Sequence, residues 1–277
     1  MSDLPAPRPG WLAAGLQWGG ILDAPETGGE AALSIMALKA FARTHQGLVR
    51  GDNQDAYLVR AFPDGLLAAV ADGMGGAPGG REASHHAIEV LERAVRQEPR
   101  SIVELERIVK RANRELYAWA HAEPRLYGMG TTLTLVQVHG QEVAVVHVGD
   151  SRAYRLREGR LDRLTKDHAV AAELLASGLL TEAEAQHHPQ RHVVTRVLGP
   201  GSSVRLDVLV VAWRPGERLL LCSDGLYDVL DDAAIAEILS THRGEDAVER
   251  LIEESLRAGG PDNVTVVLVE EEASDGR

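Results

Sequence analysis

The sequence predicts an α+β fold in which mostly antiparallel β-sheets are covered by separate groups of helices. Three observations support this fold class. Strand-like apolar runs follow one another at hairpin spacing, two long helical patterns stand in succession between the second and third runs, and a helical insertion interrupts the later strands. Alternating βαβ units would need a helix between each pair of neighbouring strands, so this order favours segregated layers.

The strand-like runs alternate or cluster apolar residues over six to nine positions and end at turn-forming residues. They occupy residues 55–62, 65–72, 130–138, 142–150, 152–159, 208–213, 218–224 and 263–270. The pair Glu158-Gly159 lies in "REGRLDRL", where it predicts a tight hairpin turn.

Helical spacing of the apolar residues predicts six helices. These cover residues 80–97, 101–121, 169–177, 181–186, 231–240 and 245–258. Residues 1–37 lack such a period and hold much of the proline and glycine, so we expect a flexible N-terminal extension before a single domain at 38–272. The two tryptophans in "WLAAGLQWGGIL" leave docking on the domain or on a partner as the alternative.

Composition excludes several classes of protein. The 277 residues are 44% hydrophobic, which suffices for a full core, and the net charge of −12 argues against a nucleic-acid or membrane-surface binder. Cys222 is the only cysteine, so a disulfide within the chain is impossible. We find no run of about 18 apolar residues and no signal-peptide pattern. We therefore expect a cytoplasmic monomer that binds neither nucleic acid nor membrane.

The glycine-rich stretch "VADGMGGAPGGR", residues 70–81, first suggests a phosphate-binding turn between a strand and a helix. Its glycine spacing is that of a relaxed dinucleotide fingerprint. A dinucleotide-binding unit then requires one helix, a parallel strand and an acidic residue about 20 positions on. Here a second helix follows the first, so the fingerprint fails in context.

Repeated placement of aspartate is more informative. Asp72, Asp150 and Asp224 each end an apolar run, and Asp262 immediately precedes one. A turn-forming role explains any single aspartate of this kind. Four that converge would raise one another's pKa unless a cation neutralised them. Oxygen ligands select a hard cation such as Mg²⁺ or Mn²⁺, and Gly73 would let its backbone carbonyl join them.

The chain resembles the metal-dependent protein serine/threonine phosphatases of the PPM (PP2C-type) family, most closely the bacterial ones. The resemblance covers residues 40–270 and rests on eight motifs in the family's order. These are "GLVRGDNQDAYLV", "VADGMGG", "GMGTTLT", "HVGDSRAYRL", "LTKDH", "HPQRHVVTRVLG", "LLLCSDGLYDVL" and "GGPDNVTVVLV". It implies a four-layer α-β-β-α sandwich, two antiparallel sheets flanked by helices.

The resemblance also implies a site. Asp72 would bridge two Mn²⁺ or Mg²⁺ ions, with the carbonyl of Gly73 on one and Asp224 and Asp262 on the other. Asp150 would bind a third, weaker ion together with Asp224.

The implied reaction is hydrolysis of phosphoserine and phosphothreonine in proteins, by a hydroxide that bridges the two core ions. Arg50 would bind the substrate phosphate and Asp55 would support the ions through water. We therefore expect phosphoprotein substrates and an opposing bacterial serine/threonine kinase.

Two positions depart from the family pattern. Gln54 stands where many members have glutamate, so we expect altered metal affinity rather than loss. Met74 stands where the animal branch has a histidine proposed as general acid. The leaving-group proton must then come from water or from another group.

Residues 165–198 match the family's variable flap, which carries His168, His187, His188 and His192. Surface or structural roles are the simpler interpretation of these histidines, and substrate recognition or proton donation is the alternative.

Other functions fit less well. A cysteine phosphatase would need arginine where Asp228 stands, and "GDSRA" precedes a hairpin rather than the helix of a serine-hydrolase elbow. A non-catalytic regulatory module with the same fold would be expected to have a broken metal site. A relative that dephosphorylates an anti-sigma-factor antagonist is disfavoured by the "GDSR" hairpin and the flap.

Overall fold

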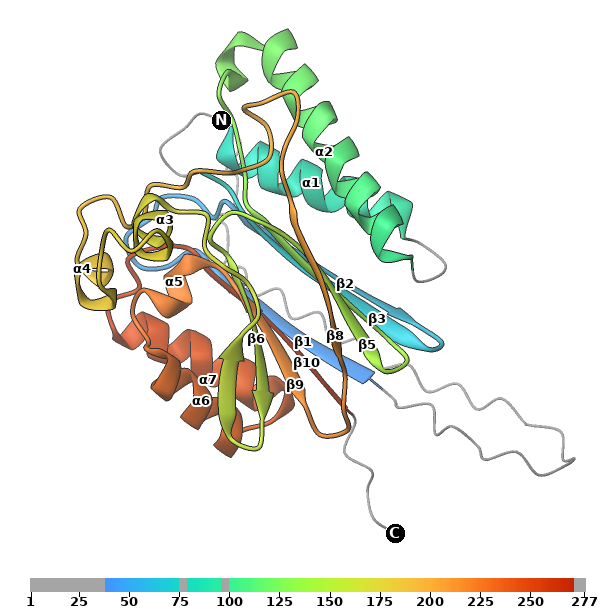
Figure 1. Ribbon diagram of the computed structural model, residues 1–277, viewed down its shortest axis with the longest axis vertical. Helices are drawn as coiled ribbons and strands as arrows, with labels where there is room; N and C mark the ends of the chain where they lie inside the picture. Colours follow the sequence, from blue (N-terminus) through green and yellow to red (C-terminus); the bar gives the residue numbers. More distant parts are fainter. Residues whose placement is uncertain (1–37, 75–78, 96–99, 272–277) are drawn as a thin grey trace, which may run out of the picture.

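Two five-stranded antiparallel sheets form the centre of the molecule (Figure 1). The computed structural model describes residues 38–74, 79–95 and 100–271. The predicted extension at 1–37, and Gly75 and Gly76 of the glycine-rich stretch, lie outside these described residues.

One sheet has the order β1-β10-β9-β6-β7 and the other β2-β3-β4-β5-β8. The strands of the first are β1 (Leu38–His45), β10 (Val264–Glu271), β9 (Arg218–Cys222), β6 (Arg152–Arg157) and β7 (Arg160–Arg163). Those of the second are β2 (Asp55–Phe62), β3 (Gly65–Asp72), β4 (Leu133–His139), β5 (Glu142–Val148) and β8 (Asp207–Ala212).

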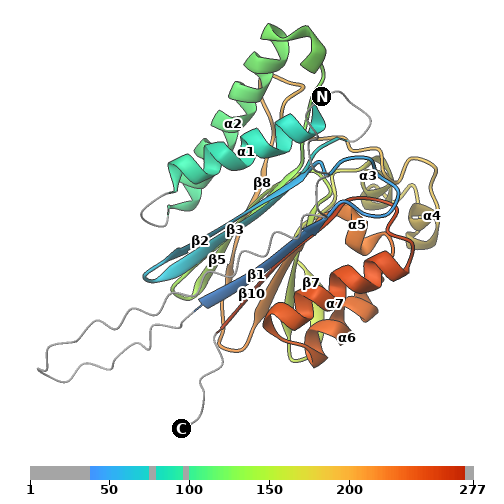
Figure 2. The same ribbon diagram turned by 180° about the vertical axis from the view of Figure 1, so that it is seen from behind.

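Helices cover the outer face of each sheet (Figures 1 and 2). On the β2–β8 sheet lie α1 (Gly80–Ala94) and α2 (Ile102–Ala122), followed by the 3₁₀ turn η1 (Pro124–Leu126). On the other sheet lie α6 (Asp232–Thr241) and α7 (Gly244–Arg257). The short helices α3 (Val170–Ala176), α4 (Glu182–Gln186) and α5 (Asp224–Tyr227) lie at one end of the sandwich.

Strand β3 shows why the layers form. Seven of its eight residues are buried, because both faces of the sheet are covered. Leu67 and Ala69 point to the cluster shared with α1 and α2, whereas Leu66 and Ala68 point to the cluster between the two sheets. A third cluster joins β6, β9 and β10 to α6 and α7. The predicted four-layer α-β-β-α sandwich is therefore confirmed.

The helix boundaries follow local capping chemistry. Helix α2 begins after Ser101, whose hydroxyl accepts from the Glu104 N–H while the Glu104 carboxylate accepts from the Ser101 N–H. Helix α1 begins after Gly79, whose φ of 79° suits glycine. It ends at Ala94, three residues before the predicted boundary.

Strand β1 was not among the predicted strands. It pairs along its whole length with β10, from Leu38 opposite Glu271 to His45 opposite Val264. Lys39 and Arg43 interrupt its apolar pattern, and the strand forms because its backbone completes the edge of a sheet assembled from distant segments.

Two predicted strands end earlier than expected. β5 stops at Val148, before Asp150, and β9 stops at Cys222, so that Asp224 opens α5 instead. The aspartates are thereby placed on loops and on a helix terminus beyond the strands, where their carboxylates can turn toward one another.

Candidate metal centre

Asp72 is the last residue of β3, and its backbone is held on both sides. The Asp72 N–H donates to Thr132 Oγ1 at 3.0 Å, and the Thr132 N–H donates to the Asp72 carbonyl at 2.8 Å. Thr131 Oγ1 donates to the same carbonyl at 2.8 Å. These bonds use the two threonines of the motif "GMGTTLT" and hold the Asp72 main chain in place.

Asp55 opens β2 directly opposite Asp72 in the β2–β3 ladder. Ser223 Oγ donates to Asp55 Oδ2 at 2.7 Å, and the buried Oδ1 has no hydrogen-bond partner. Burial raises the pKa of Asp55 to about 6. An unpartnered buried carboxylate oxygen next to other acids is a group that a hydrated cation would satisfy.

Gly73 lies where no other residue fits. A Cβ atom at this position would come within 2.2 Å of the Gly80 carbonyl oxygen and 2.9 Å of the Gln54 carbonyl oxygen. Glycine is therefore required at this position for steric reasons, and the role of its carbonyl as a metal ligand stays a prediction.

Asp224 and Asp150 follow strands of different sheets, β9 and β5 respectively. Asp224 opens α5, and burial followed by the Asp150 charge raises its pKa well above the usual range. Asp150 is buried, and burial followed by the Asp167 charge raises its pKa to about 7. Tyr227 on α5 donates its hydroxyl to the Asp150 carbonyl at 3.0 Å, which joins the two segments.

Asp262 and Arg50 form an ion pair, with Arg50 Nη2 2.6 Å from Asp262 Oδ2. Asp262 Oδ1 accepts from the Asn263 N–H at 2.8 Å. The hydrogen bond to Asp262 is the main cause that raises the pKa of Arg50, and the charges of Asp224 and Asp72 contribute. Arg50 therefore lies close enough to the predicted metal ligands for their negative charges to stabilise its positive charge.

Gln54 and Met74 both lie close to Gly80, the first residue of α1. The Gln54 N–H donates to Asn263 Oδ1 at 2.8 Å, and its buried Oε1 has no hydrogen-bond partner. The Met74 N–H donates to the Gly130 carbonyl at 3.0 Å. Gln54 thus offers a second orphaned oxygen close to Asp55.

The four predicted aspartates lie close enough for their charges to influence one another. Burial raises the pKa of Asp72 well above its usual range, and four nearby charges raise it further, those of Asp55, Asp224, Asp150 and Asp262 in decreasing order. Every candidate ligand atom in this set is an oxygen. A cluster of carboxylates that includes the unpartnered buried oxygen of Asp55 fits a hard divalent cation such as Mn²⁺ or Mg²⁺.

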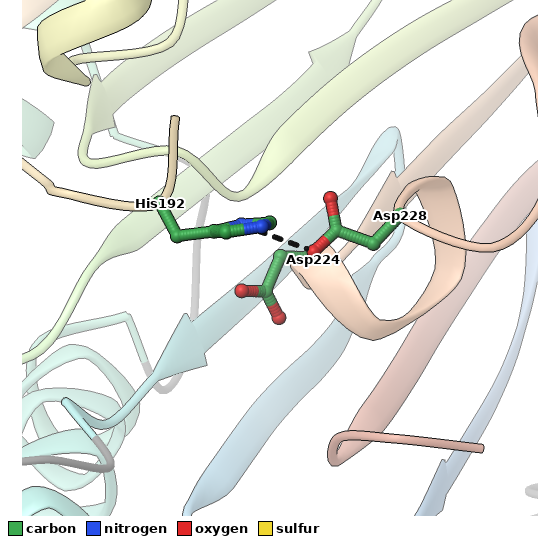
Figure 3. A group of neighbouring side chains, drawn as sticks. All are labelled: His192, Asp224 and Asp228. Atoms are coloured by element: carbon green, nitrogen blue, oxygen red, sulfur yellow. Dashed lines mark ion pairs between the residues drawn. The ribbon is translucent and has the colours of Figure 1, made fainter. Parts of the chain in front are cut away.

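The structure places Asp228, which the sequence did not indicate as a site residue, close to Asp224. In the described part of the chain, one group of three has potential ligand atoms all within 4.8 Å of one another, namely His192, Asp224 and Asp228 (Figure 3). Asp72, Asp224 and Asp262 do not form such a close group among the described residues. Both oxygens of Asp262 have protein partners. Asp228 follows Asp224 by four residues, a spacing that places both on one helical face and could have indicated it.

The flap histidines have different surroundings. His192 Nδ1 lies 3.2 Å from Asp228 Oδ2, and the His192 side chain is 44% exposed. His168 is buried, and its Nδ1 accepts from the Gly149 N–H at 3.1 Å. His187 Nδ1 lies 2.9 Å from the Ala183 carbonyl, and His188 Nδ1 accepts from the Gln190 N–H. Of the four, His192 alone belongs to the close group with Asp224.

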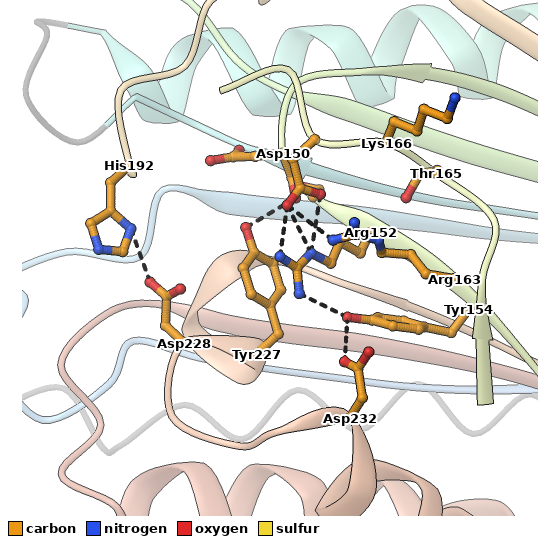
Figure 4. A network of polar contacts seen from close by, with 12 residues as sticks. Asp150, Arg152, Tyr154, Arg163, Thr165, Lys166, His192, Tyr227, Asp228 and Asp232 are labelled. Carbon is orange, nitrogen blue, oxygen red and sulfur yellow. Dashed lines mark hydrogen bonds and ion pairs between the residues drawn. The ribbon is translucent and has the colours of Figure 1, made fainter. Parts of the chain in front are cut away.

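Arg152 joins the centre to the start of the flap (Figure 4). Its guanidinium donates to both carboxylate oxygens of Asp167, with Nη2 2.6 Å from Oδ2. The same group lies 3.5 Å above the ring centroid of Tyr227 and donates to the Tyr154 hydroxyl at 3.0 Å. Tyr154 in turn donates to Asp232 at the start of α6. One side chain thus links the flap, α5 and α6.

The fold and this centre define a class of protein, an α-β-β-α sandwich with a carboxylate-rich site suited to divalent cations at one end. The chain belongs to the protein phosphatase 2C family. The sequence profile of that family, described as "Protein phosphatase 2C", matches residues 44–270.

Known relatives agree with this assignment. The chain is 40% identical over 237 residues to "Serine/threonine protein phosphatase PstP" of Mycobacterium tuberculosis, which covers 85% of this chain and 45% of PstP. It therefore spans less than half the length of that relative. It is 35% identical over 236 residues to "Serine/threonine phosphatase stp" of Listeria innocua, covering 82% of this chain and 94% of the relative.

A solved structure gives the same result. The catalytic domain of PstP in complex with 2 manganese ions matches with a TM-score of 0.76 at 39% identity, covering 85% of this chain and 99% of that one. The described helices of this chain include none that is both long and apolar enough to cross a membrane.

Proposed function

We propose that this chain is a metal-dependent phosphatase that hydrolyses phosphoserine and phosphothreonine in proteins. The observation that carries the proposal is the convergence of Asp72, Asp224 and Asp262 with Arg50 at one end of the sandwich. Two relatives, PstP and stp, are named serine/threonine phosphatases, which supports the same reaction. A non-catalytic module would be expected to have lost some of these oxygen ligands, and all of them are present.

The proposed ligands of the two core Mn²⁺ or Mg²⁺ ions are Asp72, the carbonyl of Gly73, Asp224 and Asp262, and Asp150 would hold a third ion. When bound, such ions supply an activated water near neutral pH and neutralise phosphate charge. The protein contributes rigid placement of the ligands, through the bonds of Thr131 and Thr132 to the Asp72 main chain.

Arg50 is the proposed phosphate-binding residue. Its planar guanidinium can donate two parallel hydrogen bonds to phosphate oxygens, and 43% of its side chain is exposed to incoming substrate. The ion pair with Asp262 aims the guanidinium at the centre. Phosphate binding would place charge between Arg50 and the cations, which stabilises the equatorial oxygens during transfer.

Two neighbouring residues would support this arrangement. Asp55, held by Ser223, can accept hydrogen bonds from water bound near the ions, and the free Oε1 of Gln54 can do the same. Met74 has no dissociable proton, so the leaving oxygen takes its proton from water or from another group.

Finer assignments extend the proposal. The phosphatase domain would span 38–272 with a flap subdomain at 165–198, and the partner enzyme would be a bacterial serine/threonine kinase. A monomer in the cytoplasm remains the prediction from the sequence.

The proposal is tested by hydrolysis of p-nitrophenyl phosphate in Mn²⁺, with and without EDTA. The matched variants are Asp224→Asn at the centre and Asp246→Asn on the exposed first turn of α7. We expect turnover by the wild type and Asp246→Asn, its loss in EDTA, and a decrease of at least about a hundredfold in Asp224→Asn. Metal-independent turnover, or full activity of Asp224→Asn, would contradict the proposed mechanism.

A further inference from the structure

Two consecutive large apolar side chains stand exposed immediately before the proposed phosphate-binding arginine. Leu48 is 64% exposed and Val49 is 71% exposed. Within the described residues, no other pair of consecutive large apolar residues is exposed in this way. Exposed apolar surface beside a polar site is a common feature of surfaces that bind a partner.

Leu48 and Val49 lie on a loop that hydrogen bonds hold in place. The Leu48 N–H donates to the Gly260 carbonyl at 2.8 Å, and Gln46 Nε2 donates to the Arg50 carbonyl at 2.6 Å. Asn263 Nδ2 donates to the Gln46 carbonyl at 2.8 Å. Residues 46–50 are therefore fastened to the segment that carries Asp262, and the two side chains are presented by a defined backbone.

The Leu48 side chain also rests against this segment. A Cβ atom built on Gly260 would come within 3.1 Å of Leu48 Cγ and 3.2 Å of the Leu48 nitrogen. One side of Leu48 is thus packed while the remainder faces solvent. Val49 has the larger exposed fraction and is the better position for a substitution that leaves the fold intact.

Apart from the proposed phosphate-binding Arg50, this loop offers no unpaired charge to the residues that flank the phosphate. Its charged residues are Arg50, paired with Asp262, and Asp52, paired with Arg81 at 2.8 Å. Recognition next to Arg50 is consequently left to the apolar pair. An extended peptide advances about 3.3 Å per residue, so residues adjoining a phosphothreonine bound at Arg50 are within reach of side chains one and two positions away.

We propose that Leu48 and Val49 form an apolar contact surface for the residue adjoining the phosphorylated serine or threonine of a protein substrate. The inference rests on the proposed function, and it adds a substrate class: phosphoproteins with an apolar residue next to the phosphorylated one. Leu48 and Val49 determine specificity here, and the reaction itself remains with the metal ligands and Arg50.

The test compares three phosphothreonine peptides that differ only in the two residues flanking the phosphothreonine, which are leucine, serine or glutamate. Activity in Mn²⁺ is measured for wild type, Val49→Ser, Leu48→Ser and the control Val103→Ser. Val103 is 61% exposed at the start of α2, on a different face. For each variant, kcat/KM on peptide is divided by kcat/KM on p-nitrophenyl phosphate, which removes any general effect on the centre.

We expect the wild type to favour the leucine-flanked peptide over the serine-flanked one by about tenfold, an effect equivalent to about 1.4 kcal/mol. Val49→Ser and Leu48→Ser should reduce this preference to less than about threefold through KM, whereas Val103→Ser should retain it. Equal hydrolysis of the three peptides by the wild type, a preference for glutamate, or an unchanged preference in both loop variants would overturn the inference. Failure of the wild type to hydrolyse any phosphate ester would instead overturn the proposed function.

Discussion

Asp55 and Asp72 lie directly opposite each other across the β2–β3 ladder, so that two carboxylates from adjacent strands face the same site. Like charges in this position destabilise a sheet. Burial raises the pKa of both groups, and the Asp55 charge raises the pKa of Asp72 further. The arrangement is stable at neutral pH only if protons or cations compensate the charge, and this requirement leads to the first prediction.

Without metal, we expect the protein to lose stability as pH rises above about 6.5. The pKa of Asp55 is raised to about 6 and that of Asp150 to about 7. The folded state then holds protons that the unfolded state has already released, so unfolding is favoured as pH rises through these values. Below about pH 6.5 the opposite contribution of His147, whose pKa is lowered to about 4, interferes.

Thermal unfolding in EDTA should therefore give a lower Tm at about pH 8.5 than at about pH 6.5, and Mn²⁺ should remove most of the difference. Asp150→Asn should flatten the dependence in EDTA, because the amide does not ionise. A Tm that increases over this interval in EDTA would contradict the proposed charge repulsion.

Gly73→Ala should abolish activity. The added Cβ would lie 2.2 Å from the Gly80 carbonyl oxygen, so the loop must move and carry the Gly73 carbonyl away from the centre. We expect a decrease of at least about a hundredfold in kcat/KM on p-nitrophenyl phosphate. Gly51→Ala is the control, since a Cβ there meets nothing within 4 Å. Near-normal activity of Gly73→Ala would show that this close approach is unimportant.

Arg152→Gln should destabilise the fold strongly. Arg152 and Asp167 are only 17% and 12% exposed, and removal of one partner leaves the other charge uncompensated. We expect the free energy of unfolding to decrease by about 3 kcal/mol, as measured by urea denaturation in EDTA. Arg160→Gln removes an exposed pair with Asp162 on β7 and should cost less than about 1 kcal/mol. Equal effects of the two substitutions would refute a special role for Arg152.

His192→Ala should change turnover of p-nitrophenyl phosphate by less than about threefold. The side chains of His192 and its partner Asp228 are 44% and 29% exposed, and solvent-exposed ion pairs of this kind contribute little. The measurement is kcat across about pH 6–9 in Mn²⁺, with His187→Ala as a second flap variant. A decrease of a hundredfold or more would identify His192 as the proton donor that Met74 cannot be.

Much of the fold could be predicted from the sequence because the relevant signals are local. The continuous apolar run of β3 and the capping box at Ser101 and Glu104 depend on neighbouring residues. Strand β1 was missed for the opposite reason. Its charged residues obscure the pattern, and its formation depends on pairing with β10, more than 200 positions away.

By itself, the sequence determined which residues are candidates for the proposed site: four aspartates at the ends of apolar runs, a glycine after the first of them, and an arginine in a motif shared with a known family. Only the tertiary structure decided which groups meet. Arg50 pairs with Asp262 across 212 positions, and Ser223 binds Asp55 across 168. The close group of Asp228 with Asp224 and His192 likewise depends on the packing of the flap against α5. The reason is physical: strand register and layer packing set these contacts, whereas local propensity and motif spacing carry no information about partners so distant in the chain.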